Sequence, residues 1–231
     1  VDTNKDHKCD YGCDKVTEHI WDAGVITKEP TPQDKGEKTY TCTFCKATKT
    51  EEIAALGVPE VGTADVSDDG KATYKVTKSD LEKGTVTYVA PVDKKATTVT
   101  IPATVEIDGV KYNVTAIEKN AFKKNKNLKK VTIGKNVKTI GKSAFEGCKK
   151  MTTITIGKSV EKIGEKAFYG CNKVKTLTIK TTKLNTKKIG KKAFTKVPKN
   201  VTVKVPKKKF AAYKSMLIKR GVNKKAKFKK N

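Results

Sequence analysis

The sequence predicts an α/β repeat solenoid in which each 23-residue repeat contributes one short parallel strand. The first observation is that VTIGKNVKTIGKSAFEGCKKMTT (131–153) is followed directly by ITIGKSVEKIGEKAFYGCNKVKT (154–176). The second is that eight apolar positions of the first copy stay apolar in the second: Val131/Ile154, Ile133/Ile156, Val137/Val160, Ile140/Ile163, Ala144/Ala167, Phe145/Phe168, Cys148/Cys171 and Met151/Val174. Repeats of about 20 to 29 residues with one strand each form solenoids, because a single repeat cannot bury its apolar face alone.

The repeat pattern extends in both directions. A third copy begins at Leu177 with one extra residue, and a fourth begins and stops at VTVKVP (201–206). Upstream, VTIP (99–102) opens a first copy, which is lengthened by nine residues. In each V-T-I run the aliphatic side chains point inward and the threonine points outward. We therefore expect one outward column of threonines on the sheet, which is the candidate binding face: Thr100, Thr132, Thr155, Thr178 and Thr202.

This order of V-T-I, A-F and C residues resembles the BspA-like leucine-rich repeats of bacterial surface proteins, over about 99–206. The resemblance implies a secreted or cell-surface protein of a Gram-positive anaerobe. It also implies a non-enzymatic, adhesion-type module that binds protein or glycan ligands, without naming the ligand.

The first 55 residues form a separate small module with few apolar residues. Its four cysteines are Cys9, Cys13, Cys42 and Cys45. A CxxxC pair followed 28 residues later by a CxxC pair can supply four thiolates to a structural zinc ion. Two disulfides or four reduced thiols remain open as alternatives. His7 or His19 could replace one thiolate, although we expect each to be a surface or packing residue.

Residues 19–53 resemble a short module that is repeated in surface proteins of gut Firmicutes. Within it, TYTCTFC (39–45) alternates like a strand, which would place Tyr40, Cys42 and Phe44 on one face. Trp21 is expected to fill the small core of this Cys-stapled β module.

Residues 56–97 are predicted to be a linker followed by a β-hairpin cap, before the repeats at 98–206. The cap would cover the open N-terminal end of the solenoid. Asp108-Gly109 predicts a tight hairpin turn. Residues 207–231 are predicted to be a C-terminal capping helix that ends at Gly221, followed by a basic tail that frays.

The charge is concentrated in the C-terminal half. Residues 118–231 hold 36 Lys and Arg against 4 acidic residues, a net charge of +32, whereas residues 1–117 carry −5. An alternative function is therefore electrostatic retention on an anionic polymer, such as wall teichoic acid or a glycosaminoglycan. Lysines that only aid solubility would instead be spread evenly. We expect no nucleic-acid partner, because Arg220 is the only arginine and exposed stacking aromatics are missing.

Several functional classes are not expected. No run of 18 apolar residues indicates a membrane span, and no GxSxG, P-loop or dinucleotide motif indicates an enzyme. Cys148 and Cys171 share one repeat position and have no histidine nearby in the sequence, so we expect small buried residues rather than nucleophiles. We expect a monomer without a cofactor in the repeats. The missing initiator Met indicates a portion of a longer protein.

Overall fold

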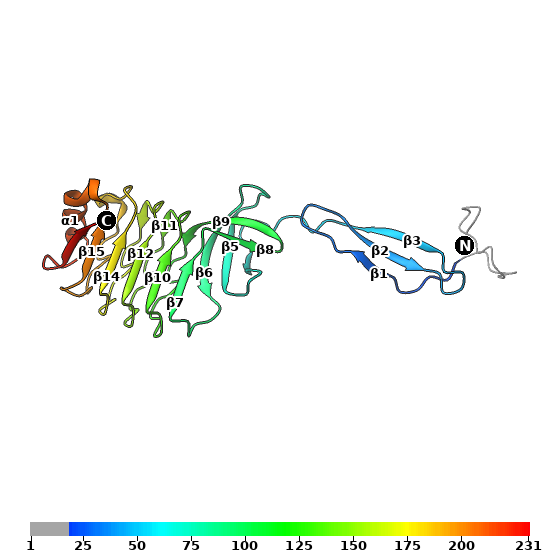
Figure 1. Cartoon of the computed structure of the whole chain (residues 1–231), viewed down its shortest axis with the longest axis horizontal. Coiled ribbons are helices and arrows are strands. Elements are labelled where there is room, and N and C mark those ends of the chain that lie inside the picture. Colours follow the sequence, from blue (N-terminus) through cyan, green and yellow to red (C-terminus); the bar gives the residue numbers. More distant parts are fainter. Residues whose placement is uncertain (1–18) are drawn as a thin grey trace. The chain divides into compact units, whose positions relative to one another are not determined.

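The computed structural model describes residues 19–231 (Figure 1). The chain divides into two compact units, residues 1–58 and 59–231, which are described separately below. Cys9, Cys13 and His7 lie outside the described residues.

The described part of the N-terminal unit is a three-stranded antiparallel sheet in the order β1 (Val25–Lys28), β2 (Gly36–Thr41) and β3 (Thr48–Ile53). Only Pro32, Gly36 and Cys42 are buried within residues 19–58. The prediction of one strand through Phe44 is wrong, because β2 ends at Thr41 and the chain then turns. Phe44 is consequently 66% exposed.

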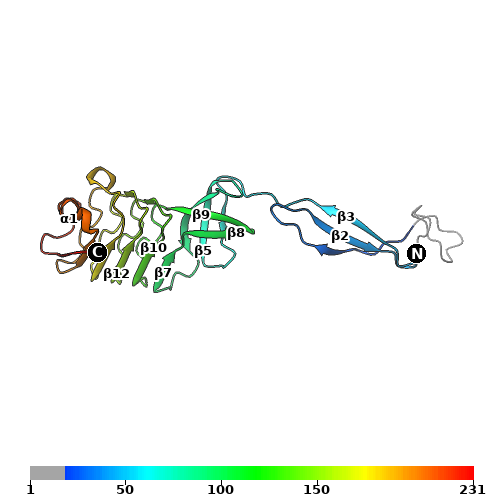
Figure 2. The same cartoon turned by 45° about the horizontal axis from the view of Figure 1, so that its top comes forward.

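The second unit contains the predicted solenoid. Its six-stranded parallel sheet contains these strands in spatial order: β7 (Thr98–Ile101), β10 (Lys130–Ile133), β12 (Thr153–Ile156), β14 (Thr176–Ile179), β15 (Thr202–Val205) and β16 (Lys227–Lys230). Figure 2 shows these strands side by side along the solenoid. The expectation of a frayed tail is wrong, because residues 227–230 form β16 and pair in parallel with β15. Phe228 is half-buried opposite Val203, which gives this segment an apolar anchor.

A second sheet was not predicted for the repeats. The returning segments contribute β11 (Thr139–Ile140) and β13 (Lys162–Ile163). Strand β11 lies between the other two strands and pairs in parallel with both β9 (Val110–Ile117) and β13. The predicted hairpin cap extends this sheet through β6 (Thr85–Pro91), β5 (Ala72–Lys78) and β4 (Ala64–Val66).

The lengthened first copy contains a hairpin, as the Asp-Gly dipeptide predicts. Strand β8 (Thr104–Ile107) returns into β9 with Ile107 opposite Val110. Asp108 and Gly109 have φ values of 51° and 70°, the left-handed conformation that such a two-residue turn requires. The N–H groups of both residues donate to the carboxylate of Asp68, at 2.9 and 3.1 Å.

Aromatic rings form a continuous stack through the core of the second unit. Phe122, Phe145, Phe168 and Phe194 stack nearly parallel, with centroids 4.9, 5.1 and 5.5 Å apart. The hairpin cap continues the stack with two buried tyrosines: Tyr88 lies 5.4 Å from Phe122, and Tyr74 meets Tyr88 edge-on at 5.3 Å. The cap therefore closes the N-terminal end of the core with rings.

Short helices close the other end of the solenoid. After η1 (Thr186–Lys188) and η2 (Lys207–Lys209), α1 (Phe210–Lys219) buries Tyr213, Met216 and Leu217. The prediction of a helix that closes the C-terminal end of the solenoid is confirmed. The Tyr213 hydroxyl of this helix accepts a hydrogen bond from the Leu184 N–H at 3.0 Å. No helix in the described part of the chain is long and apolar enough to cross a membrane.

Candidate functional sites

The predicted threonine column lies on the outward side of the six-stranded sheet. The register places Thr132 opposite Thr100 and Thr155, and Thr155 opposite Thr178. These side chains are exposed or half-buried, while the alternating aliphatic side chains of the same strands are mostly buried. Four of the five predicted threonines therefore form one column.

The fifth threonine belongs to a different column. Thr202 pairs with Thr176, and Lys204 is the residue opposite Thr178. The sequence prediction placed Val201 opposite Leu177, because VTV (201–203) has the same apolar-Thr-apolar pattern as LTI (177–179). The correct register is shifted by two residues, and a shift of two leaves every side chain on the same face of a strand. The alternation of apolar and polar residues is the same in both registers, so the sequence pattern could not distinguish them.

Two complete outward columns result from this register. One contains Thr98, Lys130, Thr153, Thr176, Thr202 and Lys227, and the other contains Thr100, Thr132, Thr155, Thr178, Lys204 and Lys229. We call these twelve residues the Thr/Lys face. It holds no acidic residue, and none of its lysines is among the ion pairs of the described chain. With strands about 4.8 Å apart, the face is about 24 Å long.

Lysines elsewhere in the second unit are not confined to this face. In the copy 131–153, Lys135, Lys142 and Lys149 lie in turns, and Lys138 precedes β11 of the second sheet. The glutamates of the repeats lie outside the six-stranded sheet, where three of them pair with lysines: Glu146 with Lys123, Glu161 with Lys183 and Glu165 with Lys142. The excess charge therefore surrounds the solenoid, while the Thr/Lys face differs by lacking acidic residues.

A cleft that the sequence did not predict adjoins the Thr/Lys face. Strand β7 ends the six-stranded sheet, so one of its edges has no neighbouring strand. Beside that edge is a cleft of about 530 Å³, lined by residues that include Tyr74, Tyr88 and Val99. Thr98 and Thr100 belong to both the face and the cleft. Cavities of about 300–1,000 Å³ accommodate small ligands or side chains of a partner.

The two repeat cysteines are buried residues of the core, as predicted. Each thiol donates to a phenylalanine carbonyl one coil earlier, Cys148 to Phe122 at 3.0 Å and Cys171 to Phe145 at 3.2 Å. Burial raises the pKa of Cys148 to about 12 and raises that of Cys171 as well. A thiol with so high a pKa is a poor nucleophile.

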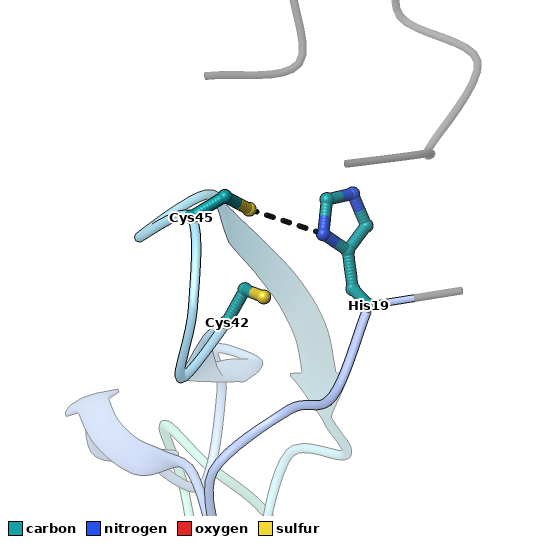
Figure 3. Close-up of side chains that lie close together, drawn as sticks. All are labelled: His19, Cys42 and Cys45. Atoms are coloured by element: carbon teal, nitrogen blue, oxygen red, sulfur yellow. Dashed lines mark hydrogen bonds between the residues drawn. The ribbon is translucent and has the colours of Figure 1, made fainter. Parts of the chain in front are cut away.

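In the N-terminal unit, His19, Cys42 and Cys45 lie close together (Figure 3). Their potential metal-ligating atoms are all within 4.8 Å of one another, and Cys45 Sγ lies 3.2 Å from His19 Nδ1. An antiparallel bridge between Trp21 and Cys42 brings residue 19 beside the CxxC turn. Cys42 and Cys45 belong to the metal set predicted from the sequence, whereas His19 was predicted to be a surface or packing residue, with replacement of one thiolate left open.

The CxxC segment forms a tight turn around the sulfur of Cys42. Burial raises the pKa of Cys42, but the backbone N–H groups of Cys45 and Phe44 and the side chains of His19 and Cys45 lower it to about 6. Lys46 closes the turn with a φ of 64°, and its N–H donates to the Cys42 carbonyl at 3.1 Å. The turn therefore favours a thiolate at position 42.

Comparisons with solved structures return leucine-rich repeat proteins. A protein from Bacteroides capillosus is 27% identical, over 55% of this chain and 87% of its own, with a TM-score of 0.43. A second, from Bacteroides ovatus, is 32% identical, over 57% of this chain and 33% of its own, with a TM-score of 0.49. A leucine rich cell surface protein from Faecalibacterium prausnitzii is 24% identical, over 63% of this chain and 45% of its own, with a TM-score of 0.37.

No match to this chain was found among curated proteins. The family model that matches is described as a BspA type leucine rich repeat region, and it finds six copies over residues 95–218. These residues are more than half of the chain, and they contain the strands of the six-stranded sheet up to β15, together with nearly all of α1. The chain belongs to the BspA-type leucine-rich repeat family.

Proposed function

We propose that this chain is a non-enzymatic interaction module of a secreted or cell-surface protein, and that the Thr/Lys face binds a protein or glycan ligand. The observation that carries the proposal is the composition of the face, which offers eight threonine hydroxyls and four ammonium groups. Hydroxyls donate and accept hydrogen bonds, and unpaired ammonium groups attract carboxylate, sulfate or phosphate. The face therefore suits an acidic glycan or an acidic protein segment.

The cleft beside β7 is the proposed end of this binding site. Thr98 and Thr100 connect the two surfaces, and the exposed Val92 and half-buried Val99 of the cleft offer apolar contact area next to the polar face. A ligand that lies along the columns would place an apolar group in the cleft.

The alternative is electrostatic retention on an anionic polymer by the whole basic surface. This diffuse mode needs no particular face and would also use lysines outside the Thr/Lys face, such as Lys135, Lys142 and Lys149. Such binding falls steeply with salt, because exposed charges separated by more than about 8–10 Å are screened at physiological ionic strength. A spread of lysines around the solenoid is equally what a role in solubility alone predicts.

Two double variants with the same charge change distinguish these functions. Lys130→Glu/Lys204→Glu alters the Thr/Lys face, whereas Lys119→Glu/Lys162→Glu alters exposed positions beside or in the second sheet. Binding to immobilised heparin, purified wall polymer and a panel of neutral and acidic glycans is measured at about 0.15 M salt. Loss of binding only in the face variant supports the proposal. Equal loss in both variants contradicts a dedicated face and supports diffuse retention.

A further inference from the structure

We infer that the N-terminal unit binds one Zn²⁺ through His19 Nδ1, Cys42 Sγ and Cys45 Sγ, with a fourth position completed by solvent or another thiolate. The sequence predicted four cysteines as ligands and left open that His7 or His19 replaces one of them; this ligand set selects His19. The role of the ion would be structural, and the inference is independent of the proposed function of the repeats.

The positions of the three donor atoms fit a single ion. A tetrahedral zinc ion lies about 2.3 Å from sulfur and about 2.0 Å from nitrogen, so its ligand atoms are about 3.5–3.8 Å apart. Cys45 Sγ and His19 Nδ1 are 3.2 Å apart, and none of the three separations exceeds 4.8 Å. Shifts of about 1 Å or less would complete the geometry.

The backbone of the CxxC turn is arranged before any metal binds. The N–H groups of Phe44 and Cys45 donate hydrogen bonds to the Cys42 sulfur, which fixes the position of this ligand atom. Lys46 adopts the left-handed conformation, which costs a residue with a side chain about 1–2 kcal/mol. Strain of this kind persists where the surrounding structure maintains it, as at a ligand-binding turn.

His19 is held in place by Trp21. The two rings lie 4.9 Å apart at an angle of 46°, and Trp21 bridges to Cys42 in the sheet. This contact explains how a histidine that is 26 residues from Cys45 comes to lie beside it. Neighbouring groups that orient a ligating histidine increase metal affinity.

The need for a metal follows from the small core of this unit. Cys42 is the only buried side chain of residues 19–58 besides Pro32, while Val25 and Leu56 are 68% and 64% exposed. Small domains with so little buried apolar surface usually need disulfides or a metal ion. Two thiolates and an imidazole favour zinc, whereas calcium and magnesium prefer oxygen ligands.

The test compares two substitutions at His19 in the full chain, purified under reducing conditions. His19→Cys supplies another zinc ligand, and His19→Asn has a similar size without the imidazole nitrogen. We expect one zinc per parent chain by elemental analysis and competition with a chelator. His19→Asn should lower the affinity by more than about 100-fold, beyond the loss typical of contacts outside the ligand shell. His19→Cys should retain tight binding.

Cobalt(II) provides a readout that a merely destabilised unit would not imitate. The thiolate-to-cobalt charge-transfer absorption should increase by one thiolate in His19→Cys relative to the parent. Cys148→Ala, which removes a thiol from the repeats, should leave the spectrum and the zinc content unchanged. Unchanged affinity in His19→Asn would overturn the inference in favour of a site without histidine. A reduced parent chain that takes up no zinc would overturn it altogether.

Discussion

The two units of this chain are stabilised internally by different kinds of interaction. All of the buried hydrophobic side chains in the described chain, except Cys42, belong to residues 59–231. There, each coil stacks its phenylalanine and its strand on the next coil, so stability depends on contacts between neighbours. Residues 19–58 form a sheet with almost no core and bring together three side chains that could hold a metal ion. Stacked repeats can therefore supply the buried surface that a globular core supplies elsewhere. A single small sheet instead needs a stabilising group such as a metal ion or a disulfide.

The largest expected effect is the loss of the repeat fold in Ile156→Asp. Ile156 is fully buried in β12, and an unpaired charge there interrupts the stacking of coils on both sides. Far-UV circular dichroism should show cooperative unfolding of the solenoid. Fluorescence of Trp21, the only tryptophan, should be unchanged because it reports on the other unit. The matched control is Thr155→Asp on the outward face, which should melt close to the parent. Parent-like melting of Ile156→Asp would refute nearest-neighbour stacking.

The ring stack permits a finer test within the solenoid. Phe145→Ala should cost about 3–5 kcal/mol of unfolding free energy, because it leaves a cavity between two stacked rings. Phe194→Ala removes a ring with one stacked neighbour, so its cost should be lower by about 0.5–1.5 kcal/mol. Chemical denaturation of both variants measures the difference. Equal costs would mean that ring stacking adds nothing to burial.

Removal of zinc by a chelator should affect the N-terminal unit and leave the solenoid unchanged. If zinc anchors residues 19–58, removing it with a chelator should increase hydrogen exchange in β1, β2 and β3 and shift the emission of Trp21. Amides of β10, β12 and β14 should keep their protection, because their stability comes from packing. Loss of protection in both units, or in neither, would contradict this division.

The smallest expected effect concerns the residue before the Ala-Phe pair of each repeat. Asn120, Ser143, Lys166 and Lys192 all adopt positive φ values, between 54° and 62°. Lys166→Gly should therefore stabilise the solenoid by up to about 1 kcal/mol, because glycine adopts this conformation without steric cost. Lys162→Gly in β13, an extended position, should instead destabilise it by about 0.5–1 kcal/mol. A shift of both melting temperatures in the same direction would contradict this reading of the backbone.

Local sequence patterns were enough to predict the solenoid, the inward and outward faces of its strands, the Asp108-Gly109 turn and the helix that closes the C-terminal end. Each of these follows from local periodicity or from the conformational preference of a few adjacent residues. The burial of Cys148 and Cys171 followed in the same way, because each sits at a fixed place in a repeat.

Only the tertiary structure decided the features that depend on long-range pairing. The register of β15 moved Thr202 to the neighbouring column, because a shift by two residues preserves the alternation of faces. The tail became β16 because β15 offered an unpaired edge and a place for Phe228. His19 reached Cys45 through the bridge between Trp21 and Cys42, a contact that no spacing in the sequence encodes. Such contacts depend on how distant segments pair, and that pairing is a property of the folded chain rather than of any local pattern.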